Sequence, residues 1–69
     1  MKAADAAKLV RKAIKRTGYS PKGKVYVRNH EMFTELRIDL SGLTRDAVWE
    51  VEQEIRQIPD GDFTWEVEG

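Results

Sequence analysis

The chain has 69 residues, of which 41% are hydrophobic and 35% are charged, with a formal net charge of zero. A chain of this size buries only about 60% of the surface that its unfolded state exposes, so we expect one domain, residues 1–69, with a thin core. The lack of cysteine excludes disulfides and thiolate chemistry. There is no apolar run of about 18 residues for a membrane span and no secretory signal pattern, so we expect a cytosolic location.

The two halves of the chain carry opposite charge. Residues 1–30 hold nine Lys and Arg side chains against Asp5 alone, a net charge of +8. Residues 31–69 hold three Arg side chains against eleven acidic ones, a net charge of −8. If the halves do not interleave in space, this separation predicts two surfaces of opposite electrostatic field. The alternative is that the halves fold together and neutralise each other across helix and sheet.

Residues 5–17 predict an amphipathic helix, with Asp5 as its N-cap and Gly18 just beyond its C-terminal end. At 3.6 residues per turn, one face of this helix is apolar and the other is basic. The apolar face consists of Ala6, Leu9, Val10, Ala13, Ile14 and Thr17. The basic face consists of Lys8, Arg11, Lys12, Lys15 and Arg16.

A loop over residues 19–23 leads into two stretches that alternate in polarity. Residues 24–28 predict a strand with Val25 and Val27 on one side, and residues 32–40 predict a second strand. A turn over residues 29–31 joins them into a β-hairpin. The apolar side of the second strand contains Met32, Thr34, Leu36, Ile38 and Leu40, and the other side contains Phe33, Glu35, Arg37 and Asp39.

Residues 45–58 predict a second helix, with Thr44 as its N-cap and Pro59 just past its end. Leu43 and Val48 have the spacing of a hydrophobic staple. The expected buried stripe contains Ala47, Val48, Val51, Ile55 and Ile58. A last strand follows a turn at residues 60–61, and its apolar residues, Phe63, Trp65 and Val67, should face the core.

The elements follow the order α-β-β-α-β, which predicts an α+β two-layer sandwich. Both helices would cover one face of a three-stranded, mostly antiparallel sheet. We expect the strand order 2-1-3, which makes the strand over residues 32–40 a free edge. The alternative is the order 1-2-3 with one parallel pair. In either case the connection through the second helix should be right-handed.

The residues that could support catalysis do not form a coherent set. His30 is the only histidine, and without cysteine it cannot complete the usual zinc ligand sets. No nucleophile-elbow sequence accompanies it, and the isolated glycines form no phosphate-binding loop. We therefore expect no enzyme activity, no catalytic residues, no metal and no cofactor, and we expect His30 to be an exposed turn residue.

The sequence indicates a binding surface instead. On the sheet face that the helices leave open, Tyr26 and Phe33 would be aromatic contacts near Arg28 and Arg37, either for a protein, including a second copy of the chain, or for unpaired bases. The alternative is a cross-strand pair that merely covers backbone. Trp49 lies outside the buried stripe of its helix. It is either an interface anchor or a side chain lying against the first helix or a loop, with Arg45 stacked on it.

Three segments resemble the large polyvalent protein-associated domains of phages and conjugative elements. They are Val10–Lys15 (VRKAIK), Lys24–His30 (KVYVRNH) and Leu36–Leu40 (LRIDL), and the stretch that contains them, residues 10–40, is about half of the chain. In that family a basic helix is similarly followed by a strand ending in arginine and by a hairpin whose second strand ends near an aspartate. The resemblance implies a mobile-element origin and a role like that of small anti-CRISPR inhibitors; a designed origin is the alternative.

The leading hypothesis is a non-enzymatic interaction protein that blocks a bacterial protein assembly, such as a CRISPR–Cas complex, by steric occlusion. The expected contact residues are Lys8, Arg11, Lys12, Lys15, Tyr26, Phe33 and Trp49. In a variant of this hypothesis, the acidic residues between Asp46 and Glu68 mimic nucleic acid. The alternative function is a nucleic-acid-binding domain, in which Lys22 and Lys24 join the basic helix in contacting phosphates while Tyr26 and Phe33 stack on bases.

Overall fold

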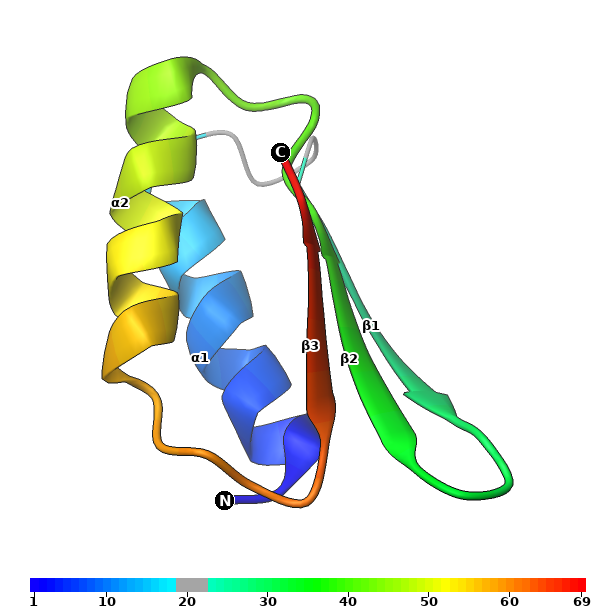
Figure 1. Cartoon of the computed structure of the whole chain (residues 1–69). Helices are drawn as coiled ribbons and strands as arrows, with labels where there is room; N and C mark the ends of the chain where they lie inside the picture. The colour runs from blue at the N-terminus through cyan, green and yellow to red at the C-terminus, as the bar shows by residue number, and fades with distance from the viewer. Residues whose placement is uncertain (19–22) are drawn as a thin grey trace.

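The predicted order of elements is present in the computed structural model, which describes residues 1–18 and 23–69. The two helices lie side by side on one face of the sheet, so the two-layer α+β prediction is confirmed (Figure 1). The elements are α1 (Ala3–Arg16), β1 (Lys24–Asn29), β2 (Thr34–Asp39), α2 (Arg45–Gln57) and β3 (Thr64–Glu68). Apart from Gly23, the loop predicted over residues 19–23 and the proposed phosphate contact of Lys22 lie outside the described residues.

The strand order is β1-β2-β3, so the expected order 2-1-3 is wrong. β2 pairs with β1 in antiparallel fashion and with β3 in parallel fashion, which makes the sheet mixed rather than mostly antiparallel. β2 is therefore the central strand and not a free edge. The β2-α2-β3 connection is a right-handed crossover, as expected (Figure 1).

The position of α1 explains why β3 does not pair with β1. α1 packs across β1 and β2. Its Arg11 also reaches the outer edge of β1, where Nη2 donates a hydrogen bond to the backbone carbonyl of Val25 at 3.2 Å. α2 packs beside α1 and returns the chain to the end of the sheet where β2 begins. β3 consequently runs parallel to β2 along the side that α1 leaves uncovered.

The N-terminal helix begins earlier than its sequence suggests. α1 starts at Ala3, and its N-cap is Lys2, which makes no side-chain capping bond, so the prediction of Asp5 as N-cap is wrong. Leu9, expected in the core, is 41% exposed because the buried face is shifted towards the alanines. Gly18 adopts a φ of 85°, the left-handed conformation expected just beyond a helix end. The buried residues are Ala3, Ala6, Ala7, Val10, Ala13 and Ile14.

The second helix begins as its sequence suggests. The Thr44 hydroxyl accepts a hydrogen bond from the backbone N–H of Ala47 at 3.3 Å, which confirms Thr44 as the N-cap. Ala47 and Val51 are buried. The rest of the predicted stripe, Val48, Ile55 and Ile58, is only partly buried against the core, so this helix is less completely covered than α1.

β2 supplies the centre of the core. Leu36 and Ile38 of β2 and Leu40, directly after it, have no exposed surface, and they pack with the buried residues of α1 and with Val51. Met32 was expected on the same face, but it is 89% exposed because the strand begins only at Thr34 and Met32 lies in the hairpin loop. Leu36 is therefore the first buried residue of β2.

This difference in burial predicts a difference in stability. Replacing Leu36→Ala should lower the free energy of unfolding by about 2–5 kcal/mol, because it leaves a cavity beneath both helices. Met32→Ala removes a side chain of similar size from an exposed site and should change the free energy by less than about 0.5 kcal/mol. Urea denaturation followed by circular dichroism measures both. Equal effects would contradict the assigned core.

Candidate functional site

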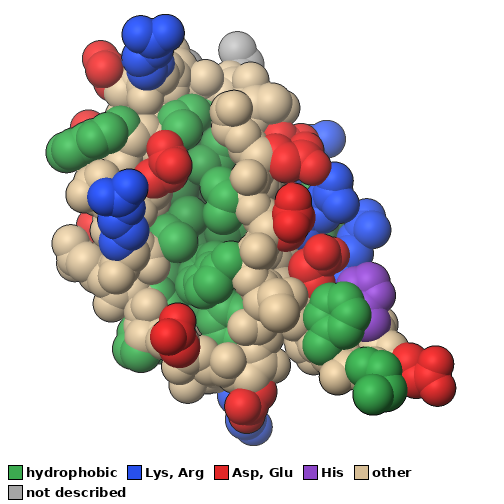
Figure 2. All heavy atoms as spheres, viewed as in Figure 1, with side chains coloured by type: hydrophobic (Ala, Val, Ile, Leu, Met, Phe, Trp, Pro, Cys, Tyr) green, Lys and Arg blue, Asp and Glu red, His purple; other side chains and the backbone are tan. Residues whose placement is uncertain are grey.

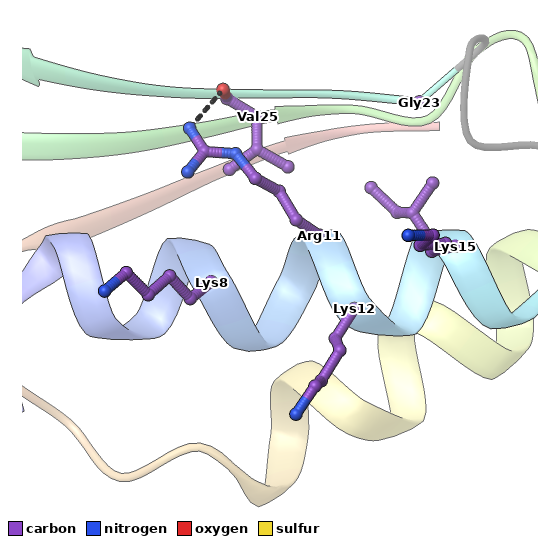
Figure 3. Close-up of a pocket in the computed structure, with 7 residues that line it drawn as sticks. Lys8, Arg11, Lys12, Lys15, Gly23 and Val25 are labelled. Atoms are coloured by element: carbon purple, nitrogen blue, oxygen red, sulfur yellow. Dashed lines mark hydrogen bonds between the residues drawn. The ribbon is translucent and has the colours of Figure 1, made fainter.

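A basic groove runs between α1 and the start of β1, with a volume of about 430 Å³ (Figure 3). Its apolar part is formed by Ile14, Val25 and Gly23, and its other lining residues are Lys8, Arg11, Lys12 and Lys15. The glycine permits this close approach, because a Cβ at Gly23 would stand 2.6 Å from a methyl group of Ile14. The arrangement is an apolar surface surrounded by four cationic side chains.

The cations of the groove differ in how firmly they are held. Arg11 is anchored by its hydrogen bond to the Val25 carbonyl, which holds the guanidinium against the outer edge of β1. Lys8 and Lys12 extend from the helix without a described partner (Figure 3). A fixed, planar guanidinium beside movable ammonium groups suits carboxylates, since Arg binds them in a defined geometry and Lys acts as a point charge.

The positive charge of the groove is not neutralised within the described part of the chain. No carboxylate of residues 1–18 or 23–69 lies within 4.0 Å of the charged nitrogens of Lys8, Arg11, Lys12 or Lys15. On α1 the ion pair is made instead by Arg16, whose Nη1 lies 3.3 Å from Glu54 Oε1 of α2. The opposite charges of the two halves thus meet at the helix–helix contact and leave the groove positive.

Trp49 lies on the outer surface of the helix layer and is 62% exposed. A second, smaller groove of about 250 Å³ separates it from α1. The lining residues of this groove are Ala13, Arg16, Trp49, Glu50, Gln53 and Glu54. The ring borders α1 but is not buried against it, so its exposed area is available for contact with another molecule.

The open face of the sheet carries charges of both signs. Across its rows, Tyr26 of β1 lies beside Arg37 of β2, which lies beside Glu66 of β3. Arg28 lies beside Glu35 in the neighbouring row. The basic side of this face is thus β1 and the acidic side is β3, with a mixture on β2 between them.

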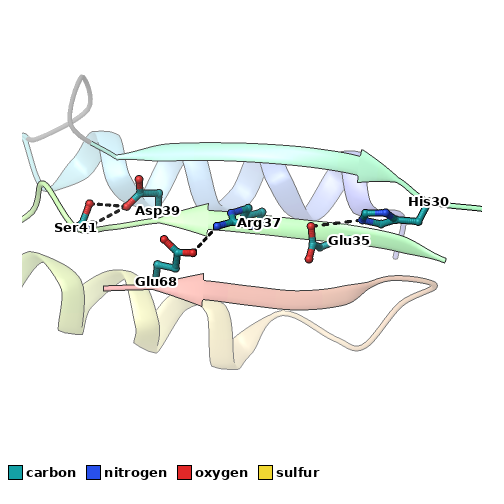
Figure 4. Close-up of polar contacts among 6 residues, drawn as sticks. All are labelled: His30, Glu35, Arg37, Asp39, Ser41 and Glu68. Atoms are coloured by element: carbon teal, nitrogen blue, oxygen red, sulfur yellow. Dashed lines mark hydrogen bonds and ion pairs between the residues drawn. The ribbon is translucent and has the colours of Figure 1, made fainter.

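Tyr26 and Phe33 do not form the cross-strand pair that was one interpretation of their positions. The cross-strand partner of Tyr26 is Arg37, and Phe33 lies before β2, in the hairpin loop. There its ring stacks on His30, with ring centroids 4.4 Å apart. His30 Nε2 also lies 3.6 Å from Glu35 (Figure 4). His30 is exposed, as expected, and it helps to order the end of the hairpin.

The seven expected contact residues do not share one surface. Lys8, Arg11, Lys12 and Lys15 lie on α1, and Trp49 lies on the outer face of α2. Tyr26 points to the opposite, open side of the sheet, and Phe33 is at the hairpin tip. The structure also adds residues that sequence analysis missed: Gly23, Ile14 and Val25 of the groove. The only sequence signal for them was Gly23, directly before the predicted strand that contains Val25 and Val27.

Towards the end of β2, polar side chains on the open face of the sheet contact one another (Figure 4). Arg37 donates a hydrogen bond to Glu68 of β3, which ties the two parallel strands together. Ser41 donates two hydrogen bonds to Asp39 Oδ1, from its hydroxyl at 2.6 Å and from its backbone N–H at 3.0 Å. These bonds, the hydroxyl one foremost, lower the pKa of Asp39 below its usual 3.8, and Lys24 and Arg37 lower it further.

No helix in the described part of the chain is long and apolar enough to cross a membrane. Residues 1–18 and 23–69 contain no cluster of three or more His, Cys, Asp or Glu side chains that could hold a metal ion. Comparisons of the chain with protein-family models, with curated proteins and with solved structures gave no match. The functional argument therefore rests on the groove and the surfaces themselves.

The Asp39 contacts predict a pH effect. Because the pKa of Asp39 is lower in the folded chain than in the unfolded chain, the contact stabilises the fold above the unfolded pKa. This stabilisation is lost as the pH falls through the folded pKa. Ser41→Ala should raise the pKa of Asp39 towards its usual value, and Ser41→Thr, which keeps a hydroxyl, should raise it less. A carbon-13 NMR titration of the carboxyl group measures both; an unchanged midpoint in Ser41→Ala would refute the assignment.

Proposed function

We propose that this protein is a non-enzymatic interaction module that binds an acidic surface of a partner protein through the groove between α1 and β1. The observation that carries the proposal is the set of four cations around an apolar floor, without a described carboxylate in reach. A partner carboxylate entering the groove would gain charge-assisted hydrogen bonds, and an apolar side chain beside it would cover Ile14 and Val25.

Trp49 extends the proposed contact surface across the helix layer. Exposed tryptophans are enriched among the residues that dominate binding energy at protein interfaces. A standard interface buries about 800 Å² on each partner. The whole chain exposes 4902 Å², so such a contact would occupy about one sixth of its surface. In a partner bound to the outer face of both helices, the surface that this contact covers would be inaccessible to other molecules.

The resemblance to the polyvalent protein-associated domains gives this module its proposed setting. A small phage or mobile-element protein in the cytosol of a bacterial host would bind a host assembly and occlude its working surface. A CRISPR–Cas defence complex is an assembly of this kind. The occlusion mechanism needs neither a catalytic group nor a cofactor from this chain.

The alternative function is nucleic-acid binding, which the unpaired cations of α1 favour because phosphates would also satisfy them. The charges on the open face of the sheet argue against nucleic-acid binding. Besides the cations next to Tyr26, this face carries Glu35, Asp39, Glu66 and Glu68, and these carboxylates would repel a phosphate backbone. Stacking on Tyr26 and phosphate contact with α1 would also have to occur on opposite sides of the sheet.

Fluorescence anisotropy distinguishes the two functions. Labelled single-stranded and double-stranded DNA and RNA are titrated with the protein at about 50 and 200 mM salt. The proposal predicts no binding of any of these probes at the lower salt concentration. Binding that weakens steeply between the two concentrations would establish phosphate contacts and would make nucleic-acid binding the better account.

Charge reversal tests the groove itself. In a pull-down from bacterial lysate, the double variant Lys12→Glu, Lys15→Glu should lose the protein that the unmodified chain captures, because it replaces two attractive charges with repulsive ones. Lys24→Glu makes the same kind of change on the open face of the sheet and should retain the captured protein. Loss of capture in both variants, or in neither, would contradict the assignment of the groove.

A further inference from the structure

The helix layer is wider than the sheet it covers. Packed helices lie 8–10 Å apart, whereas neighbouring strands lie about 4.8 Å apart, so each helix covers about two strands. α1 accordingly lies over β1 and β2, and its Cα atoms approach both strands within 8 Å. No Cα atom of α2 lies within 8 Å of a strand Cα atom. Two helices therefore cover three strands, and α2 extends over the position that a fourth strand beside β3 would occupy.

An apolar trough marks this position. Figure 2 shows a hollow between α2 and β3 that is floored by hydrophobic side chains and open to the surface. The side chains that face it are only partly buried, and Val67 is 37% exposed. They include Val48 and Ile55 from α2, and Phe63 and Trp65 from the β3 side, whose rings pack edge to face at 5.1 Å.

The outer edge of β3 presents free backbone groups beside the trough. The Glu68 carbonyl accepts a hydrogen bond from the N–H of Leu40, so the backbone groups of Glu68 face the rest of the sheet. Because these groups alternate along a strand, those of Trp65 and Val67 point outwards. No described segment pairs with them. On β1 the corresponding edge differs, since Arg11 occupies the Val25 carbonyl there.

We propose that the edge of β3 accepts a fourth strand, an extended segment of a partner protein in which apolar residues alternate with basic ones. Its backbone would pair with Trp65 and Val67, and its apolar side chains would fill the trough beneath α2. Its basic side chains would then project on the open face, beside Glu66 and Glu68. Glu68 already binds Arg37, whereas Glu66 has no ion pair among the described residues, so Glu66 is the principal acidic contact.

A second copy of this chain fits the edge poorly. Two β3 strands paired with each other would place the acidic residues Asp62, Glu66 and Glu68 of one copy among those of the other, and like charges in opposed strands are destabilising. A copy that entered through its β1 edge would bring its own α1, which lies over β1 and β2, against α2. The space under α2 is suited to a single strand that carries no helix.

The test uses the full chain and a synthetic peptide of seven residues that alternates lysine and valine, with blocked ends. Nitrogen-15 NMR follows its binding, and amide hydrogen exchange follows the N–H groups of Trp65 and Val67. We expect the peptide to slow exchange at both amides. A peptide with glutamate in place of lysine should bind more weakly. A peptide whose backbone nitrogens on the side of β3 are methylated should not bind, because it cannot donate the hydrogen bonds of the strand pairing.

Two variants locate the contact. Glu66→Lys should weaken binding of the lysine–valine peptide by about fivefold, the size of a reversed cross-strand charge pair. Glu50→Lys makes the same charge change in the groove between the two helices and should leave the affinity unchanged. Equal binding of the lysine and glutamate peptides, or unprotected Trp65 and Val67 amides, would overturn the proposal. So would concentration-dependent self-association that protects these amides without peptide, since a second copy would then cover the edge.

Discussion

The parallel pairing of β3 with β2 determines how charge is distributed over this protein. α1 and β1 come from the basic half of the chain, and α2 and β3 come from the acidic half. With β2 in the centre, these halves lie at opposite ends of the sheet and of the helix layer. Had β3 paired with β1, the two halves would have alternated across the sheet. The sequence separation of charge is thus preserved as a separation in space.

This distribution leaves each end of the sandwich with a different surface. At the β1 end, α1 packs closely, Arg11 binds the Val25 carbonyl at the sheet edge, and the remaining cations surround an apolar groove. At the β3 end, α2 stands further from the strands, and the sheet edge is free beside an apolar trough. Among the described residues, the Arg16–Glu54 ion pair between the helices joins the two halves, whereas Arg37 and Glu68, which pair within the sheet, both belong to the acidic half. A partner that contacts both ends would meet a basic surface at the β1 end and an acidic surface at the β3 end.

The elements of the fold could be predicted from the sequence because their signals are local. The helical periodicity, the Thr44 cap and Gly18 each act within a few residues, and the structure has them as expected. Strand order could not be predicted in this way. It depends on α1 lying over β1 and β2, a contact between segments that are distant along the chain. Met32 and Leu9 were misplaced because periodicity alone does not show where a strand begins or how far a helix rotates.

The candidate site was predictable in part. The basic face of α1 follows from the helical wheel, and its four cations line one groove. The floor of that groove could not be inferred, because it joins Ile14 to Gly23 and Val25 across the helix–sheet contact. Tyr26 and Phe33 were grouped on the assumption that both lie in paired strands. The hairpin loop takes Phe33 out of the sheet and stacks it on His30 instead.

The strand order can be tested directly by nuclear Overhauser effects between backbone protons in solution. The account predicts cross-strand effects between β2 and β3 in parallel register, with Leu36 opposite Trp65 and Ile38 opposite Val67. It also predicts antiparallel effects between β1 and β2, with Tyr26 opposite Arg37. Cross-strand effects between β1 and β3 would contradict the account, because the charged halves would then interleave and neither the basic groove nor the free β3 edge would exist as described.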